Sequence, residues 1–167
     1  MITLGAKDAR EALDRVVDPE IPVLTIAELG ILRGVEQTAD GAVRVTITPT
    51  YSGCPAVDAI RDDIRTALAA DGFRDISVEV VLSPAWTTDW ISAAGRRKLA
   101  DFGIAPPARA GHPGPVPVTI RPRPPAVCCP RCGSERTREV SRFGSTACKA
   151  QYRCDACLEP FDYFKSL

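Results

Sequence analysis

The sequence predicts an α+β protein in two parts, a two-layer domain of about 100 residues and a small β-rich ribbon that a metal ion holds together. Three observations lead to this prediction. Helical and strand periodicities alternate through residues 1–104. Eight of the 15 prolines lie in residues 105–125, which is typical of an extended linker. Two Cys-x-x-Cys pairs lie in residues 126–167, which we assign to the ribbon.

The first predicted element is a helix over residues 4–17, in which apolar residues recur at helical spacing. Thr3 provides its N-cap, and Asp18 and Pro19 stop it because a proline ring cannot continue a helix. Asp18 and Glu20 flank Pro19 in a stiff loop. They are candidates for placing a ligand or partner; the alternative is a helix stop with two solvated carboxylates.

A strand pair is predicted next. The apolar run over residues 29–36 forms a strand that turns at Asp40-Gly41. In residues 43–48 apolar and polar side chains alternate, which predicts a half-buried strand.

A helix, a strand and a last helix complete the first domain. One apolar stripe predicts a helix that Asp71-Gly72 ends, and its members are Val57, Ile60, Ile64 and Leu68. Alternation then predicts a strand over residues 76–82. The last helix follows residues 84–90 and ends at Gly103, with an inward side formed by Ile91, Ala94, Leu99 and Phe102.

The charge of zero is a sum over unlike parts. Residues 1–104 carry 11 basic and 16 acidic side chains, whereas residues 105–125 and 126–167 carry net charges of +3 and +2. The single histidine, His112, lies in the linker, which excludes sites that need several imidazoles. No apolar run reaches the roughly 18 residues of a membrane helix, and we find no export signal, so we expect a cytoplasmic protein.

The strongest chemical signal is the pair of knuckles formed by Cys129 with Cys132 and by Cys154 with Cys157. Two such knuckles supply the four thiolates of a tetrahedral metal site, and structural zinc is the favoured ion. A ribbon this small cannot bury enough apolar surface by itself, whereas structural zinc supplies about 10–16 kcal/mol of folding free energy. Iron in the same site is an alternative; disulfides are disfavoured without an export signal.

Three further cysteines lie outside the knuckles. Cys128 and Cys148 are interpreted as packed thiols, although Cys148 lies between the knuckles and is a candidate for approaching the metal. Cys54 differs because Pro55 is a natural first helical residue, which predicts Cys54 at the N-cap. Unpaired amides there favour a thiolate, so Cys54 is a candidate metal ligand or nucleophile, with an inert buried cysteine as the alternative.

Several motifs resemble a known family. In the first domain Asp-Pro-Glu at residues 18–20, Leu-Gly at 29–30, Ser-Gly-Cys-Pro-Ala at 52–56 and Ser-Pro-Ala-Trp at 83–86 resemble the iron–sulfur maturation domain of SufT and of eukaryotic cytosolic targeting factors. The C-terminal motifs resemble the PaaD branch, encoded with the phenylacetyl-CoA epoxidase. They cover residues 129–134, 143–146, 148–149 and 159–165.

The resemblance implies an iron–sulfur-assembly-like fold in which Cys54 aligns with the reactive cysteine, and Asp18 and Glu20 with an acidic loop. It implies an accessory protein for aerobic phenylacetate degradation that assists iron or iron–sulfur centre assembly without catalysing the oxygenation. The implied cofactors are structural zinc and a transient iron or iron–sulfur cluster. The implied partners are the di-iron oxygenase, the iron–sulfur flavin reductase and general iron–sulfur assembly proteins.

Three alternatives stay open at this point. The chain could be a purely structural subunit of the epoxidase. A nucleic-acid-binding ribbon is suggested by the basic tail, but interleaved acidic residues favour a solvated face. A cysteine-nucleophile enzyme lacks an evident base in the ordered part of the chain.

Overall fold

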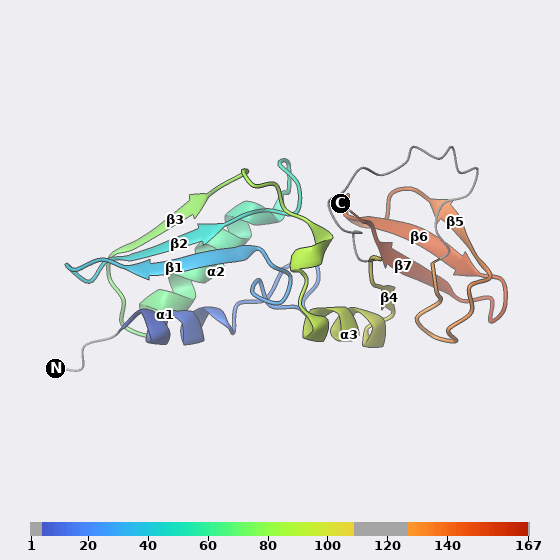
Figure 1. The fold of residues 1–167 in the computed structure, drawn as a ribbon, viewed down its shortest axis with the longest axis horizontal. Helices are drawn as coiled ribbons and strands as arrows, with labels where there is room; N and C mark the ends of the chain where they lie inside the picture. The colour runs from blue at the N-terminus through green and yellow to red at the C-terminus, as the bar shows by residue number, and fades with distance from the viewer. Residues whose placement is uncertain (1–4, 109–126, 167) are drawn as a thin grey trace, which may run out of the picture. The chain divides into compact units, whose positions relative to one another are not determined.

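The computed structural model describes residues 5–108 and 127–166, which divide into two compact units, residues 5–98 and residues 99–108 with 127–166 (Figure 1). His112 and residues 109–125 of the predicted linker lie outside the described residues. The boundary lies within helix α3 (Ala93–Asp101), so residues 99–104, which we expected in the first domain, lie with the ribbon.

The first unit is a three-stranded sheet with two helices packed against it (Figure 1). Strands β1 (Leu32–Gln37) and β2 (Val43–Ile47) form an antiparallel pair, and β3 (Ile76–Val80) runs parallel to β2. Helices α1 (Ala6–Leu13) and α2 (Ala56–Ala70) supply the second layer. The two-layer prediction is therefore confirmed.

The core of this unit joins β2 to α2. The inward side chains of β2 have no exposed surface, and they are Val43, Val45 and Ile47. The predicted stripe of α2 is buried at Ile60, Ile64 and Leu68. Each such side chain stabilises the fold by about 1.5–3 kcal/mol relative to exposure.

The first helix is shorter than predicted at both ends. Its N-cap is Gly5 instead of Thr3, and the Asp8 carboxylate accepts a hydrogen bond from the Gly5 N–H at 2.7 Å. The helix ends at Leu13, because residues 16–17 pair with the segment that returns at Thr25. β-branched Val16 and Val17 favour this extended pairing over helix.

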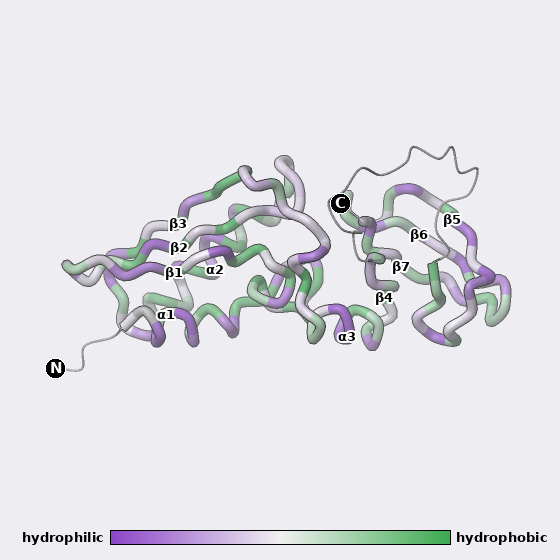
Figure 2. The backbone as a smooth tube through the Cα atoms, viewed as in Figure 1, coloured by the Kyte–Doolittle hydropathy of each residue, from purple (hydrophilic) through white to green (hydrophobic). Residues whose placement is uncertain are grey.

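The C-terminal end of β3 also differs from the prediction. The strand ends at Val80, and 39% of Val80 and 55% of Leu82 are exposed. β3 is an edge strand, so among the described residues only β2 lies beside it in the sheet. Figure 2 shows the hydrophobic stretch at the end of β3 in green.

The last helix is preceded by the short 3₁₀ helix η1 (Thr88–Trp90). Ile91 and Leu99 are buried as predicted, but Ala94 is half-buried and 55% of Phe102 is exposed. The inward assignment of Phe102 was wrong because α3 ends at Asp101 and the positive φ of Gly103 turns the chain there.

The second unit is a four-stranded sheet in the order β4-β7-β6-β5. Strands β5 (Thr137–Ser141), β6 (Lys149–Cys154) and β7 (Pro160–Phe164) are antiparallel, and the short β4 (Ile104–Ala105) runs parallel to β7. Ala105 and Val127 belong to one buried cluster with Tyr152 and Phe161. The described residues on both sides of the proline-rich segment therefore belong to the ribbon.

Candidate functional site

Four thiols meet at one end of the ribbon sheet. The Sγ atoms of Cys129, Cys132, Cys154 and Cys157 all lie within 4.8 Å of one another. The Cys129–Cys157 and Cys132–Cys154 Sγ pairs are 3.8 and 3.6 Å apart. Thiolates placed tetrahedrally at about 2.3 Å from zinc lie about 3.8 Å apart, so the described thiols fit a four-cysteine zinc site.

The two knuckles use the same backbone design. The residue after the second cysteine is left-handed in both, with φ of +72° at Gly133 and +65° at Leu158. In the first knuckle the Cys129 N–H donates to the Ser134 carbonyl at 3.0 Å. In the second, the Cys154 N–H donates to the Glu159 carbonyl at 2.9 Å. A non-glycine residue rarely adopts a positive φ, so the conformation at Leu158 depends on the surrounding structure.

Backbone donors and crowding act differently on the thiols of this cluster. Backbone N–H groups of Cys157 and Ala156 donate to the Cys154 sulfur and lower its pKa to about 6. At Cys132 a backbone hydrogen bond from Ser134 acts in the lowering direction, but desolvation and the other three thiols outweigh it and raise the pKa to about 12. Without a cation, four crowded thiols cannot all ionise, and a bound divalent ion removes that conflict.

The structure does not bring Cys148 or Cys128 into this group. Cys148 is buried just before β6 begins, whereas Cys154 ends that strand, which places them roughly 20 Å apart. The Cys148 Sγ lies 3.1 Å from the Thr146 hydroxyl. Cys128 is exposed.

The motif loops of the first unit gather at one end of its sheet. Leu32 at the start of β1 pairs with Ile47 at the end of β2, which pairs with Val80 at the end of β3. The loops that precede β1, follow β2 and follow β3 therefore meet at the same end of the sheet. These loops carry the motifs at residues 29–30, 52–56 and 83–86.

Cys54 lies in the loop between β2 and α2 and is half-buried. The N-cap of α2 is Pro55, so Cys54 precedes the N-cap by one residue. The Cys54 carbonyl accepts the Val57 N–H at 3.3 Å, which gives the helix a tight first turn and moves its α-helical start to Ala56. Cys54 is therefore adjacent to the helix terminus instead of capping it.

Asp18 and Glu20 have different surroundings. Asp18 is 4% exposed, and its Oδ1 accepts hydrogen bonds from the N–H groups of Glu20 and Ile21 at 2.9 and 2.8 Å. The hypothesis of two solvated carboxylates fails for Asp18, which fixes the turn after Pro19. Glu20 is half-buried.

The contacts that Trp86 and Trp90 make with Leu29, Gly30 and Arg33 were not predicted from the sequence. The Trp86 indole N–H donates to the buried Leu29 carbonyl at 3.1 Å. Gly30 has φ of +78°, and a Cβ there would lie 2.6 Å from the Trp90 Cβ. The Arg33 guanidinium lies 3.5 Å from the centroid of the Trp90 ring. The signal was Leu-Gly directly before a strand together with two tryptophans, which fit a close backbone approach.

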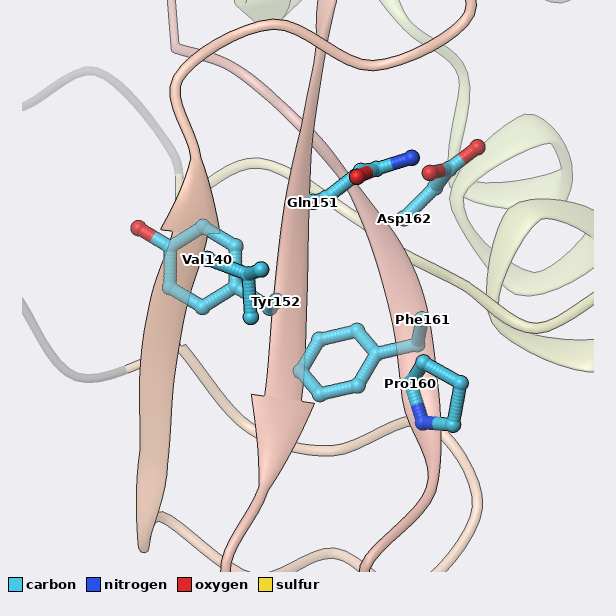
Figure 3. Close-up of a pocket in the computed structure, with 6 residues that line it drawn as sticks. All are labelled: Val140, Gln151, Tyr152, Pro160, Phe161 and Asp162. Carbon is cyan, nitrogen blue, oxygen red and sulfur yellow. The ribbon is translucent and has the colours of Figure 1, made fainter.

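Two cavities lie within the second unit. One of about 340 Å³ is lined by side chains of β5, β6 and β7, including Val140, Tyr152 and Phe161 (Figure 3). The other, of about 400 Å³, lies between the end of α3 and the first knuckle, where Arg131 and Glu159 form an ion pair at 2.6 Å.

Comparisons with known proteins cover both units. Residues 6–80 match the iron–sulfur cluster assembly protein family, and residues 113–165 match the PaaD zinc beta ribbon domain. A protein of Escherichia coli K12 that is provisionally named as a 1,2-phenylacetyl-CoA epoxidase subunit is 51% identical over 93% of this chain and 89% of its own length. The Fe-S protein maturation auxiliary factor YitW of Bacillus subtilis is 40% identical over 48% of this chain and 79% of its own length.

Solved structures resemble the first unit. A DUF59 domain from Bacillus anthracis superposes with a TM-score of 0.53 at 27% identity, covering 56% of this chain and 90% of its own. A Thermotoga maritima protein, TM0487, gives 0.51 at 28% identity over 59% of this chain and 98% of its own.

Fold and site together define an iron–sulfur-assembly domain joined to a four-cysteine zinc ribbon. The chain belongs to the PaaD family, as its identity to the E. coli relative over nearly the whole length shows. The predicted fold class and family resemblance are confirmed. Within residues 5–108 and 127–166, no helix combines the length and apolar character needed to cross a membrane.

Proposed function

We propose that this chain is an accessory factor that assists assembly of the iron or iron–sulfur centres of a phenylacetyl-CoA epoxidase and does not itself catalyse the oxygenation. The observation that carries the proposal is the pairing, within one chain, of an iron–sulfur assembly domain with a PaaD ribbon. The names of its relatives support both the link to the epoxidase and the role in maturation. The E. coli relative is named as an epoxidase subunit, and the B. subtilis relative as a maturation factor.

Cys54 is the functional thiol in this proposal. It is half-buried in a loop at the end of the sheet where the other motif loops meet, so the sulfur is held by the fold while solvent reaches part of the residue. A cysteine next to a helix N-terminus is favoured as thiolate, the form that binds iron. The cargo iron or cluster is transferred to a client; the chain itself contributes the thiolate and the loop that presents it. Asp18 holds the shape of the loop after Pro19, and Glu20 contributes a carboxylate to that loop.

The ribbon is the client-docking part in this proposal. Zinc bound to the four ribbon cysteines would hold the two knuckles together and supply folding free energy rather than chemistry. The clients are the di-iron oxygenase and the iron–sulfur flavin reductase of the epoxidase, with general iron–sulfur assembly proteins as the source of cargo. We propose that this assembly takes place in the cytoplasm.

The proposal is tested by complementation. Cells that lack this chain but express the epoxidase subunits receive the wild type, Cys54→Ser or Cys128→Ser. We expect Cys54→Ser to lower epoxidase activity by tenfold or more, on the order of the loss of a positioned ligand. Cys128→Ser, an exposed thiol outside the zinc group, should retain activity. Equal activity of all three would remove the role of Cys54.

A purely structural subunit is the second candidate, and the subunit name of the E. coli relative favours it. It predicts co-purification with the oxygenase at fixed stoichiometry, whereas a maturation factor exchanges freely. The nucleic-acid hypothesis loses support, since Arg131, Arg138 and Lys149 all pair with acidic residues within 3.5 Å.

A further inference from the structure

The two edges of the first unit's sheet are built differently. Strand β1 carries a bulge between Leu32 and Gly34, a device that discourages a further strand from pairing. At the other edge β3 pairs with β2 in regular register and has neither bulge nor proline. Among the described residues no strand pairs with the outer edge of β3.

The backbone of β3 has hydrogen-bonding groups on that outer edge for which residues 5–108 and 127–166 supply no strand partner. The Val43 N–H donates to the Asp75 carbonyl, and the Val81 N–H donates to the Ile47 carbonyl. In a parallel pair the bonding residues alternate, so residues 75, 77, 79 and 81 direct their backbone groups toward β2. Ile76, Val78 and Val80 therefore direct theirs away from the sheet.

This edge is complementary to itself. If two copies of β3 run antiparallel with Val78 on the two-fold axis, Ile76 of one copy lies opposite Val80 of the other. Those pairs and the central Val78 pair are the hydrogen-bonded ones, because these three residues have the outward backbone groups. Val80, 39% exposed in one copy, gains an apolar neighbour.

The charges fit the same register. Ser77 and Glu79 are exposed on the other face of the strand, and each Ser77 lies opposite the Glu79 of the second copy. The two Glu79 carboxylates are therefore not opposite one another. Each carboxylate also has a cation at hand, since Arg44 Nε lies 3.4 Å from Glu79 in its own copy.

We propose that this protein forms a homodimer in which the β3 strands of two copies pair antiparallel and join the sheets into one of six strands. Isologous pairing of this kind is the commonest form of symmetric assembly. Antiparallel pairing places the Cys54 loops of the two copies at opposite ends of the joined sheet, because that loop follows the end of β2 in each. The proposed β3–β3 contact therefore covers neither thiol loop.

Two substitutions at one exposed position test the register with opposite signs. Ser77→Arg places a cation opposite Glu79 of the second copy, and Ser77→Asp places an anion there. An opposite-charge cross-strand pair contributes about 0.2–1 kcal/mol and occurs twice per dimer, so Ser77→Arg should lower the dimer Kd about 2- to 30-fold. Ser77→Asp should raise it by a smaller factor, because Arg44 of the same copy is the cross-strand partner of residue 77 and offsets part of the added charge. Sedimentation velocity across the micromolar range gives both values.

A second pair of variants tests the apolar contact. Val80→Lys places charges at both ends of the proposed ladder and should leave the chain monomeric over that range. Val140→Lys, another exposed strand valine, should leave the dimer unchanged. Hydrogen exchange at the Val78 and Val80 amides should slow as wild-type concentration rises. A wild-type mass of 17.9 kDa at every concentration, or equal Kd values for the two Ser77 variants, overturns the proposal.

Discussion

The sulfur atoms of Cys132 and Cys154 lie 3.6 Å apart although strand β5 lies between these residues in the chain and Cys154 is the last residue of β6. The separation matches two neighbouring vertices of a zinc–thiolate tetrahedron. The ribbon sheet has few large buried side chains and ends in four crowded thiols. Its stability therefore depends on a cation that neutralises the thiolate charges.

Zinc removal should therefore unfold the ribbon. We expect about one zinc per wild-type chain, and loss of most β-sheet protection within residues 127–166 when Cys132→Ser removes a ligand, because structural zinc supplies about 10–16 kcal/mol of folding free energy. Metal analysis with hydrogen exchange measures both. Cys128→Ser is the control and should keep full zinc content; a folded, zinc-loaded Cys132→Ser ribbon would contradict the assignment.

The turn at Asp18 gives a separate prediction. Asp18→Ala removes the acceptor of the Glu20 and Ile21 N–H groups and should lower the free energy of unfolding by about 1–2 kcal/mol. Asp18→Asn keeps an oxygen acceptor and should retain most of that stability. Urea unfolding measures the difference, and equal losses for both variants would point to a role for the charge instead of the turn.

Alanine substitutions at two glycines with the same backbone conformation distinguish the cost of backbone strain from the cost of steric overlap. Gly30 and Gly41 have φ of +78° and +88°, but a Cβ at Gly30 would lie within 3 Å of Trp90 atoms, whereas a Cβ at Gly41 would face open space. Gly41→Ala should cost about 1–2 kcal/mol for the left-handed conformation. Gly30→Ala should cost a further 1–3 kcal/mol or so for overpacking. Thermal unfolding of both variants provides the measurement, and equal midpoints would remove the inferred Trp90 contact.

The place of β4 in the ribbon sheet predicts that the chain can be divided. A fragment of residues 1–108 should co-purify with residues 127–167 when the two are co-expressed with zinc, because Ile104 and Ala105 pair with Asp162 and Tyr163. Ala105→Asp puts a charge in a position that is 1% exposed and should abolish the association. Independent folding of residues 127–167 without the other fragment would show that β4 is dispensable.

Sequence periodicity and cysteine spacing predicted the features that depend on residues close together in the chain. The alternation in β2 and the stripe on α2 gave the two-layer core, and the Cys-x-x-Cys spacing gave the metal site. The errors arose where tertiary contacts override local propensity. Val16 and Val17 leave the helical pattern to pair with the segment at Thr25, and Gly95 takes the buried position on α3 because a Cβ there would lie 3.0 Å from the Glu28 carbonyl oxygen. Phe102 was assigned to the interior since periodicity cannot show that the helix has already ended.

The cysteine cluster was predicted and the arrangement of the motif loops was not, again because only the former depends on local spacing. Spacing within one knuckle is local, so the sequence was enough to select the two pairs of cysteines that meet in one cluster. The assembly of the three motif loops around the end of the sheet depends on β2 and β3 being parallel, which no local pattern encodes. The roles of Trp86 and Trp90 at Leu29 and Gly30 join positions more than 50 residues apart.

The central claim, that Cys54 acts in building the metal centres of the epoxidase, is tested most directly by the iron content of its clients. The oxygenase and reductase subunits are purified from cells that express this chain as wild type or as Cys54→Ser, and iron and acid-labile sulfide are measured per subunit. We predict full loading with the wild type and severalfold lower loading with Cys54→Ser at unchanged subunit yield. Equal loading of both subunits in the two strains would contradict the claim.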